Sequence, residues 1–318
     1  MNWTEGLYNE QNNGSTGFGK LISPTMNKTI NSFTILMLIS TMVSLGCTME
    51  ISKIKAHFLR PRGVVIALVA QFGIMPLTAF SLAKVFKLKH IEALTVLVCG
   101  CCPGGSLSNM FALALKGDMN LSITMTTCSS ITALGIMPLL LLLYSKGFNN
   151  LGSAVSFTSI LFSLILTLVP CGIGITINHH KPHYSPVILK VGLGIWLVCL
   201  VVVSVLSGMT LGLTIWIVFS PHLMAVAALM PLTGFIFGYL ISSIFKLSPQ
   251  CCRTISMETG CQNIQLCATI LKVAFTPQVI GPLYLFPAIY IVFQGAEALI
   301  FIILFRCYQA LKPPAEDK

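Results

Sequence analysis

The stretch MPLTAF at residues 75–80 returns as MPLTGF at residues 230–235, 155 residues later. At the same offset, Gly105 of the segment CCPGGSLSN falls on Gly260 of the segment METGCQNIQ. Each half of the chain therefore carries a glycine-broken polar segment at the same place within a very apolar region. Two interrupted apolar segments at matching positions in two halves are the pattern expected where a secondary transporter binds its substrate and ions.

The composition indicates a membrane protein. The mean hydropathy is +0.87, and only 9% of the residues are charged, whereas a soluble domain carries about 25%. The 318 residues leave room for nine or ten spans of about 20 residues each. The formal net charge of +10 comes from basic residues in short loops, which set membrane orientation more often than they bind nucleic acid. We therefore expect the lipid bilayer, and no nucleic acid, as a partner.

The hydropathy pattern predicts an all-α polytopic fold of about nine transmembrane helices. The spans are expected at about 30–50, 63–85, 91–115, 119–144, 154–177, 186–208, 222–245, 254–275 and 281–306. The repeated segment in the second span and its copy in the seventh are five spans apart, and an odd number of crossings reverses direction. The fold is therefore predicted to be an inverted repeat, in which spans one to four pair with spans six to nine.

Loop charges and sequons predict the orientation. With the N-terminus outside, twelve Lys and Arg residues lie in inner segments and seven in outer ones, as the positive-inside rule favours. Asn2 and Asn13 begin the sequons NWT and NGS, which agrees with an exposed tail. We expect residues 1–28 to form an extracellular tail glycosylated on Asn2 and Asn13, residues 29–308 the transmembrane domain, and residues 309–318 a cytoplasmic tail. This is the topology of a multi-pass plasma-membrane protein.

Two acidic residues, Glu258 and Glu297, lie deep inside predicted spans. A charge at the centre of a bilayer costs about 3 kcal/mol or more unless it is paired or faces a polar cavity, so such a residue is a functional candidate. Glu258 is followed by the polar run TGCQN, and we assign it a functional role. Glu297 has Gln294 as its one polar neighbour, and the favoured interpretation for it is a packing carboxyl bonded to another helix.

In the first half, Pro103-Gly104-Gly105 interrupts the third span, because proline lacks a backbone donor and glycine weakens a helix. The carbonyls freed there are tolerated in lipid only where they are buried or line a cavity. Ser108 and Asn109 follow the break. Ser122 and Thr126 lie four residues apart on the next span and therefore share one helix face. These side chains place neutral oxygens beside the break.

The candidate ligands are mostly neutral oxygens with one carboxylate, Glu258. No His or Cys cluster of transition-metal spacing accompanies them, and calcium would favour two or more carboxylates. The set is typical of a monovalent cation site, and sodium is the expected ion. Gln71, alone in an apolar run, fits a ligand and a hydrogen bond between helices equally well. The alternative for Ser and Thr is close helix packing, which we accept for Thr127, Ser129 and Ser130.

Several segments closely resemble the sodium/bile acid cotransporter family, and the resemblance covers residues 30–310. They are GCTMEISKIKAH (46–57), ALVAQFGIMPLTAF (67–80), LVCGCCPGGSLSN (97–109), KGDMNLSITMTTCS (116–129) and SMETGCQNIQLCATI (256–270). The combination of CPGG…SN with ETG…QN is highly specific. The Ser106 position departs from the Asn or Thr that is frequent in relatives, which leaves substrate preference open.

The resemblance implies a panel domain and a core domain, with broken spans three and eight crossing at the midplane. The panel would hold the spans at about 30–50, 154–177 and 186–208, and the core about 63–144 and 222–306. The resemblance also implies two sodium ions as coupling ions and no cofactor. Residues that match the first sodium site are Ser108, Asn109, Ser122, Thr126 and Glu258. Those that match the second are Gln71, Glu258 and Gln262, with backbone carbonyls near Thr259 and Cys261.

These inferences predict a sodium-coupled symporter that imports conjugated bile salts and related amphipathic organic anions by alternating access. Transport of other organic anions such as steroid sulfates is an alternative. A receptor-type membrane protein with structural helix breaks is a second alternative, and it would show no flux and no sodium dependence. An intramembrane enzyme is not expected, because the spans hold no Ser/His or paired-Asp constellation.

Overall fold

The computed structural model describes residues 24–47, 62–148, 157–211, 216–273, 275 and 280–311, and it is built of helices. In chain order these are α3 (Pro24–Cys47), α5 (Arg62–Val69), the π-helical turn η1 (Ala70–Ile74), α6 (Met75–Val85), α7 (His90–Cys101), α8 (Leu107–Ala114), α9 (Met119–Ser145), α10 (Phe157–His180), η2 (Pro182–Tyr184), α11 (Ser185–Leu211), α12 (Pro221–Ile244), α13 (Pro249–Gly260), α14 (Ile264–Val273), η4 (Gly281–Leu285) and α16 (Phe286–Leu311). The predicted all-α class is confirmed for the described residues.

Several of these helices could cross a membrane by length and composition. Among the described residues four qualify alone: Arg62–Val85, Pro182–Val203, Pro221–Ile244 and Gly281–Leu311. A fifth is added if Met119–Ala133 and Gly135–Ser145, bent by 61° at their junction, form one span. A polytopic membrane protein is thus supported, while the count of nine stays a prediction.

The bend in α9 has a cause in the sequence. Pro138 lies inside the helix, and a proline ring removes one hydrogen bond and clashes with the carbonyl four residues earlier. That carbonyl belongs to Leu134, which is the residue between the two straight pieces of α9. The helix therefore bends where proline chemistry requires it.

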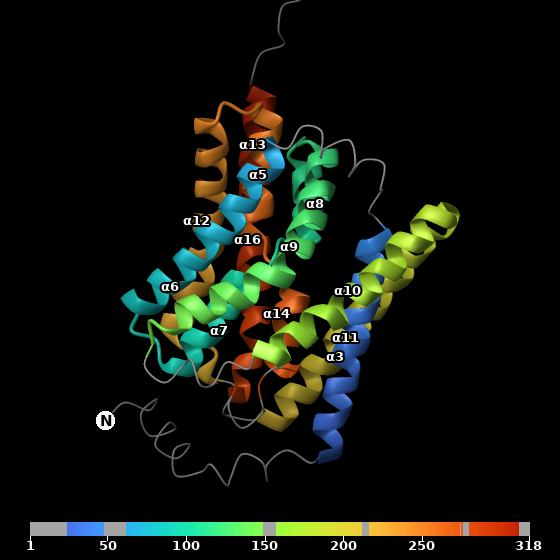
Figure 1. Ribbon diagram of the computed structural model, residues 1–318, viewed down its shortest axis with the longest axis vertical. Helices are drawn as coiled ribbons and strands as arrows, with labels where there is room; N and C mark the ends of the chain where they lie inside the picture. The colour runs from blue at the N-terminus through green and yellow to red at the C-terminus, as the bar shows by residue number, and fades with distance from the viewer. Residues whose placement is uncertain are drawn as a thin grey trace, which may run out of the picture.

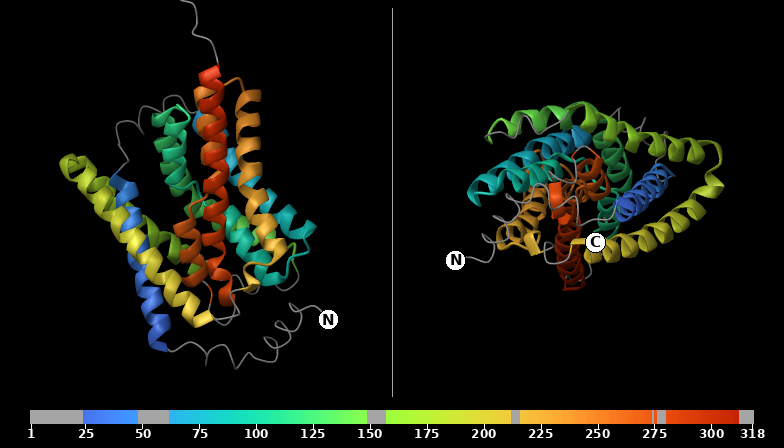
Figure 2. Two further views of the ribbon diagram at one scale, coloured as in Figure 1. Left: turned by 180° about the vertical axis from the view of Figure 1, so that it is seen from behind. Right: turned by 90° about the horizontal axis from the view of Figure 1, so that it is seen from below.

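Three helices, α3, α10 and α11, form a group beside the remaining helices, and α3 packs against both of the others (Figure 1). The view from below in Figure 2 places α3 between α10 and α11. Glycines allow this closeness: a Cβ on Gly46 of α3 would overlap the Cys171 carbonyl of α10, and one on Gly174 would overlap the Val43 carbonyl. Small residues serve this purpose in membrane helix pairs, where backbones must approach closely to gain packing energy.

Helices α6, α7, α9, α12, α14 and α16 share one large apolar core. Its fully buried members include Leu94 and Leu97 of α7, Met137 of α9, Met230 of α12 and Tyr290 of α16. The three-helix group contacts this body through α9 and α14. A polar contact also joins the two parts, because the Lys272 ammonium of α14 donates to the Thr34 hydroxyl of α3 at 2.8 Å.

Candidate functional site: a buried oxygen cluster at two helix breaks

Two helix breaks lie against each other inside the larger body. The chain leaves helix between Cys101 and Leu107, and again between Gly260 and Ile264. Across the gap, the Gly105 N–H donates to the Cys261 carbonyl at 2.9 Å, and the Asn263 N–H donates to the Pro103 carbonyl at 2.9 Å.

The two breaks pair as a short antiparallel bridge, centred on Gly104 and Gln262. Backbone groups released from the helices are thus satisfied by each other, as burial in an apolar surrounding demands. The breaks that the sequence predicted at the two polar segments are present in the structure.

Glycine is required at the bridge because the chains approach so closely. A Cβ on Gly105 would lie 2.6 Å from the Gln262 carbonyl oxygen, which no real contact permits. A Cβ on Gly104 would overlap the Glu258 carboxylate. The CPGG segment therefore breaks the helix and also gives the carboxylate its space.

The residues predicted for the first ion site come together around Glu258. Its Oε2 accepts from the Ser108 hydroxyl at 2.5 Å and from the Thr126 hydroxyl at 3.0 Å. Asn109 Oδ1 accepts from the Ser122 hydroxyl at 2.6 Å and lies 3.2 Å from the Thr126 hydroxyl. All but Asn109 are at most 1% exposed. Residues 150 positions apart in the chain thus form one buried polar cluster.

This cluster holds more acceptors than protons. The Thr126 hydroxyl is within bonding distance of Glu258, Asn109 and the Ser122 carbonyl, yet a hydroxyl has one proton to donate. Ser108 likewise lies near both Glu258 and the Gly105 carbonyl. Glu258 Oε1 is buried and has no hydrogen-bond partner among the described residues. A surplus of buried oxygen lone pairs around one carboxylate is the environment that a bare monovalent cation satisfies.

A second cluster surrounds Gln71, which lies in the π-helical turn η1. Such turns are frequent at functional sites, because the extra residue re-aims side chains. The Gln71 amide nitrogen donates to the Cys102 carbonyl and to Gln262 Oε1, both at 2.9 Å. Its own Oε1 is buried without a hydrogen-bond partner in the described part of the chain. Gln71 thus ties the span before the first break to both breaks.

The other members of the predicted second site are engaged in hydrogen bonds. The Thr259 carbonyl accepts from the Gln262 amide nitrogen at 3.0 Å, and the Cys261 carbonyl accepts in the bridge. Each carbonyl has a second lone pair, which leaves room for one further partner. Gly104, which pairs with Gln262 and abuts Glu258, stands between the two clusters.

Sequence reasoning missed two groups here. One is the Cys102 carbonyl that Gln71 binds. The other is Gln294 of α16, fully buried, whose Oε1 accepts from the Gln262 N–H at 3.2 Å. A lone buried amide in an apolar helix was the available signal for Gln294, and it was read only as a neighbour of Glu297.

Glu297 was expected to form a hydrogen bond to another helix, but the structure shows no such bond for one of its two carboxylate oxygens among the described residues. Its buried Oε2 has no hydrogen-bond partner among the described residues, and the same holds for the Tyr290 hydroxyl and Gln294 Nε2. These three residues lie on one face of α16, three and four positions apart.

The predicted glycosylation residues Asn2 and Asn13 lie outside the described residues.

Two broken helices that meet at a cluster of buried side-chain oxygens inside an apolar helical protein are the pattern of a membrane transport protein. The profile described as "Sodium Bile acid symporter family" matches residues 35–227, and the chain belongs to that family. It is therefore a transporter and not an enzyme.

Individual relatives agree with this assignment. The chain is 56% identical over 303 residues to the hepatic sodium/bile acid cotransporter of Rattus norvegicus, which covers 95% of this chain and 83% of that protein. It is 52% identical over 314 residues to the hepatic sodium/bile acid cotransporter of Homo sapiens, covering 96% and 90%. It is also 40% identical over 295 residues to the human ileal sodium/bile acid cotransporter, covering 92% and 83%.

Proposed function

We propose that the protein is a sodium-coupled symporter that imports conjugated bile salts and related amphipathic organic anions. The observation that carries the proposal is the cluster at Glu258, where one carboxylate and several neutral oxygens outnumber the protons available to them. The names of the relatives supply the substrate class. If sodium binds at this cluster together with the anion, the inward sodium gradient would drive uptake of the anion against its own gradient.

Two sodium ions are assigned to the two clusters. The first would be held by Ser108, Asn109, Ser122, Thr126 and Glu258. The second would be held by Gln71, Glu258, Gln262 and the carbonyls of Thr259 and Cys261. Each assignment is supported by a buried side-chain oxygen that has no hydrogen-bond partner among the described residues, Glu258 Oε1 in one cluster and Gln71 Oε1 in the other. A carboxylate shared by two monovalent ions would be the one formal negative charge between them.

We assign α3, α10 and α11 to a panel domain and the remaining helices to a core, within an inverted repeat of nine spans. The separate packing of the three-helix group supports this division. The N-terminus would be extracellular and the C-terminus cytoplasmic, as loop charges favour. Alternating access would then consist of core and panel moving against each other around the crossed breaks.

Coupling of two sodium ions to one monovalent anion would carry one net charge inward. That charge gains about 2.3 kcal/mol from a membrane potential of 100 mV. Uptake should therefore be electrogenic and should rise when the cell interior is made more negative.

Uptake of radiolabelled taurocholate into transfected cells, with sodium replaced by choline, tests the proposal. We expect uptake in sodium and background in choline. The receptor alternative predicts no uptake in either medium, and it would replace our proposal if observed. A steroid sulfate used in parallel decides whether the anion class is broader than bile salts.

A further inference from the structure

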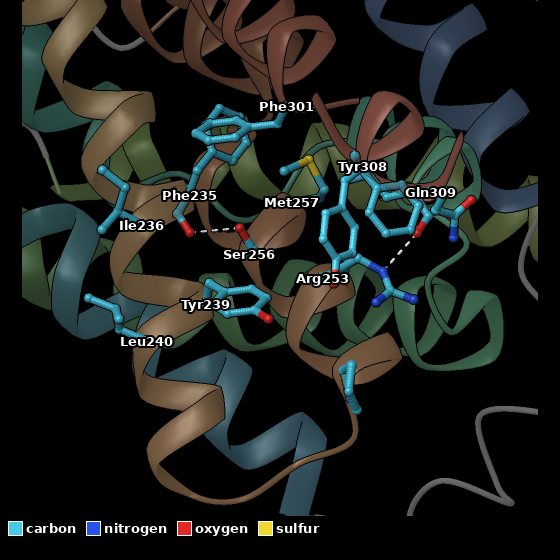
Figure 3. A pocket seen from close by; sticks show the side chains of 13 residues that line it. Phe235, Ile236, Tyr239, Leu240, Arg253, Ser256, Met257, Phe301, Tyr308 and Gln309 are labelled. Atoms are coloured by element: carbon cyan, nitrogen blue, oxygen red, sulfur yellow. Dashed lines mark hydrogen bonds between the residues drawn. The ribbon is translucent and has the colours of Figure 1, made fainter. Parts of the chain in front are cut away.

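A cavity of about 880 Å³ opens between α12 and α16, with α13 behind it. Phe235 and Phe301 lie together at one end of it, and Arg253 lies away from them near Tyr308 (Figure 3). We call this cavity the α12–α16 groove. Its volume falls within the range of about 300–1,000 Å³ that small-molecule sites occupy.

The walls of the groove suit a hydrocarbon chain. The rings of Phe235 and Phe301 meet edge to face, with centroids 5.6 Å apart. Leu240 and Ile236 of α12 are 47% and 43% exposed, so this part of the wall faces outward from the molecule. In a membrane protein such a face meets lipid, and an apolar hollow there is filled by a lipid chain rather than by water.

One charged side chain lies in this apolar lining, and it is held in place. Arg253 Nε donates to the Leu115 carbonyl at 2.7 Å and its Nη2 donates to the Lys116 carbonyl at 2.9 Å. Its guanidinium carbon lies 4.8 Å above the centre of the Phe305 ring. These bonds use two of the five N–H donors of a guanidinium. No carboxylate lines the groove in the part of the chain that the structure describes.

Charged residues of both signs lie in the segment beside Arg253. Asp118 comes two residues after Lys116, and its carboxylate is used at the start of α9, where it accepts from the Leu121 N–H at 3.0 Å. The basic residues Lys116 and Lys246 each lie two residues after the end of a helix, α8 and α12 respectively. Figure 1 shows that the end of α8, the start of α13 and the end of α16 lie at the same end of the molecule. Under the proposed orientation this end is cytoplasmic, where basic groups meet the anionic lipids of the inner leaflet.

We propose that the α12–α16 groove binds one anionic phospholipid of the cytoplasmic leaflet. One acyl chain lies over Phe235 and Phe301, and the lipid phosphate bonds to the free edge of the Arg253 guanidinium. Guanidinium and phosphate form strong charge-assisted bonds, which gives the site its preference for the lipid class. Only the choice of leaflet rests on the proposed orientation.

The site connects to the oxygen cluster through α13. Met257 lines the groove, while the next residue, Glu258, belongs to the oxygen cluster. The Ser256 hydroxyl also fixes α13 to α12 by donating to the Phe235 carbonyl at 2.6 Å. A bound lipid therefore packs behind the half-helix that positions the carboxylate, and it supports that half-helix against displacement.

The proposal is tested on the purified full-length protein by native mass spectrometry. After delipidation in detergent, the protein is titrated with phosphatidylserine or with phosphatidylcholine of the same acyl chains. We expect wild-type protein to retain phosphatidylserine about fivefold more strongly, which is what one basic residue contributes near an anionic surface. Arg253→Gln should abolish this difference. Arg306→Gln, which removes an exposed charge outside the groove lining, should leave it unchanged.

Arg253→Gln also removes the hydrogen bonds to the Leu115 and Lys116 carbonyls, so loss of lipid binding by this variant could reflect local unfolding. A second variant that keeps these bonds is therefore needed. Leu240→Trp fills the groove from its exposed wall and leaves the arginine contacts untouched, so it should lose both lipids while staying monodisperse in size-exclusion chromatography. Equal retention of the two lipids by wild-type protein would overturn the proposal, as would undiminished retention by Leu240→Trp. Displacement of phosphatidylserine by taurocholate would mean that the groove takes the organic anion instead.

Discussion

Gly104 lies so close to Glu258 that a β-carbon at residue 104 would overlap the carboxylate. The helix break of the first half thus fits around the charged residue of the second half, and each fixes the position of the other. The oxygen cluster is therefore a property of both breaks together.

We predict that Gly104→Ala displaces the Glu258 carboxylate and reduces sodium-dependent uptake strongly. Overpacking a tight site costs about 1–3 kcal/mol, which corresponds to about 5- to 150-fold in sodium affinity. Gly295→Ala is the matched control, since a Cβ there meets nothing within 4 Å. Uptake across a sodium series for the two variants checks this, and equal, wild-type curves would contradict the contact.

Glu258→Gln should reduce uptake to near background while surface expression survives. The substitution keeps the shape of the side chain and removes the one formal charge assigned to both sodium ions. Surface biotinylation together with taurocholate uptake measures the two quantities.

Glu92→Gln is the control for removing a carboxylate elsewhere. Glu92 accepts from the Lys89 N–H at 3.0 Å at the start of α7, and glutamine can fill that capping role equally well. It should transport normally. Normal sodium-dependent uptake by Glu258→Gln would show that the ions are bound elsewhere.

How much of this site could be predicted depends on what a residue type reveals by itself. Proline and glycine mark breaks in any apolar span, and a buried carboxylate stands out by its cost, so Pro103-Gly104-Gly105 and Glu258 were readable in the sequence. The serines and threonines were readable by helical spacing. The repeat, which puts a polar helix break in each half, grouped Ser108 with Glu258, 150 residues away; the assignment of each residue to one of two sodium sites came only from matching segments of a known family.

Other features depend on backbone geometry that residue types do not encode. The π-helical turn at Gln71 and the use of the Cys102 carbonyl arise from how the chains cross. The observed helix ends also differ from the predicted span ends. Helix α3 begins at Pro24 and not near residue 30, because hydropathy marks the thickness of the hydrocarbon and not the end of the hydrogen-bonded helix. For the same reason α16 continues to Leu311.

We predict that Asn2 and Asn13 carry glycans. Digestion with an N-glycosidase should sharpen and lower the band of the protein on a gel, and replacing both asparagines by glutamine should reproduce that shift. A tail that can be labelled only after the membrane is permeabilised would reverse the proposed orientation, and with it the leaflet assigned to the lipid site.

The two proposed sodium sites can be separated by single substitutions. Asn109→Ala removes the oxygen that accepts from Ser122 in the first cluster. Gln71→Ala removes the Oε1 of the second cluster, which has no hydrogen-bond partner within the described part of the chain. Each is a neutral ligand, so each loss should weaken sodium binding by about 1–3 kcal/mol, the cost of an unmade polar contact. In a sodium titration of uptake this corresponds to a shift of about 5- to 150-fold.

If two ions accompany one anion, wild-type uptake should be sigmoidal in sodium, and both variants should move the midpoint to higher sodium and lower the maximum. If one ion is used, the wild-type curve should be hyperbolic and one variant should match it, which identifies the cluster that binds no coupling ion. Ser130→Ala is the control, since its hydroxyl donates to a backbone carbonyl of its own helix and should leave the curve unchanged. Unmoved midpoints in both Asn109→Ala and Gln71→Ala would place sodium outside both clusters, because neither amide oxygen would then contribute to its binding.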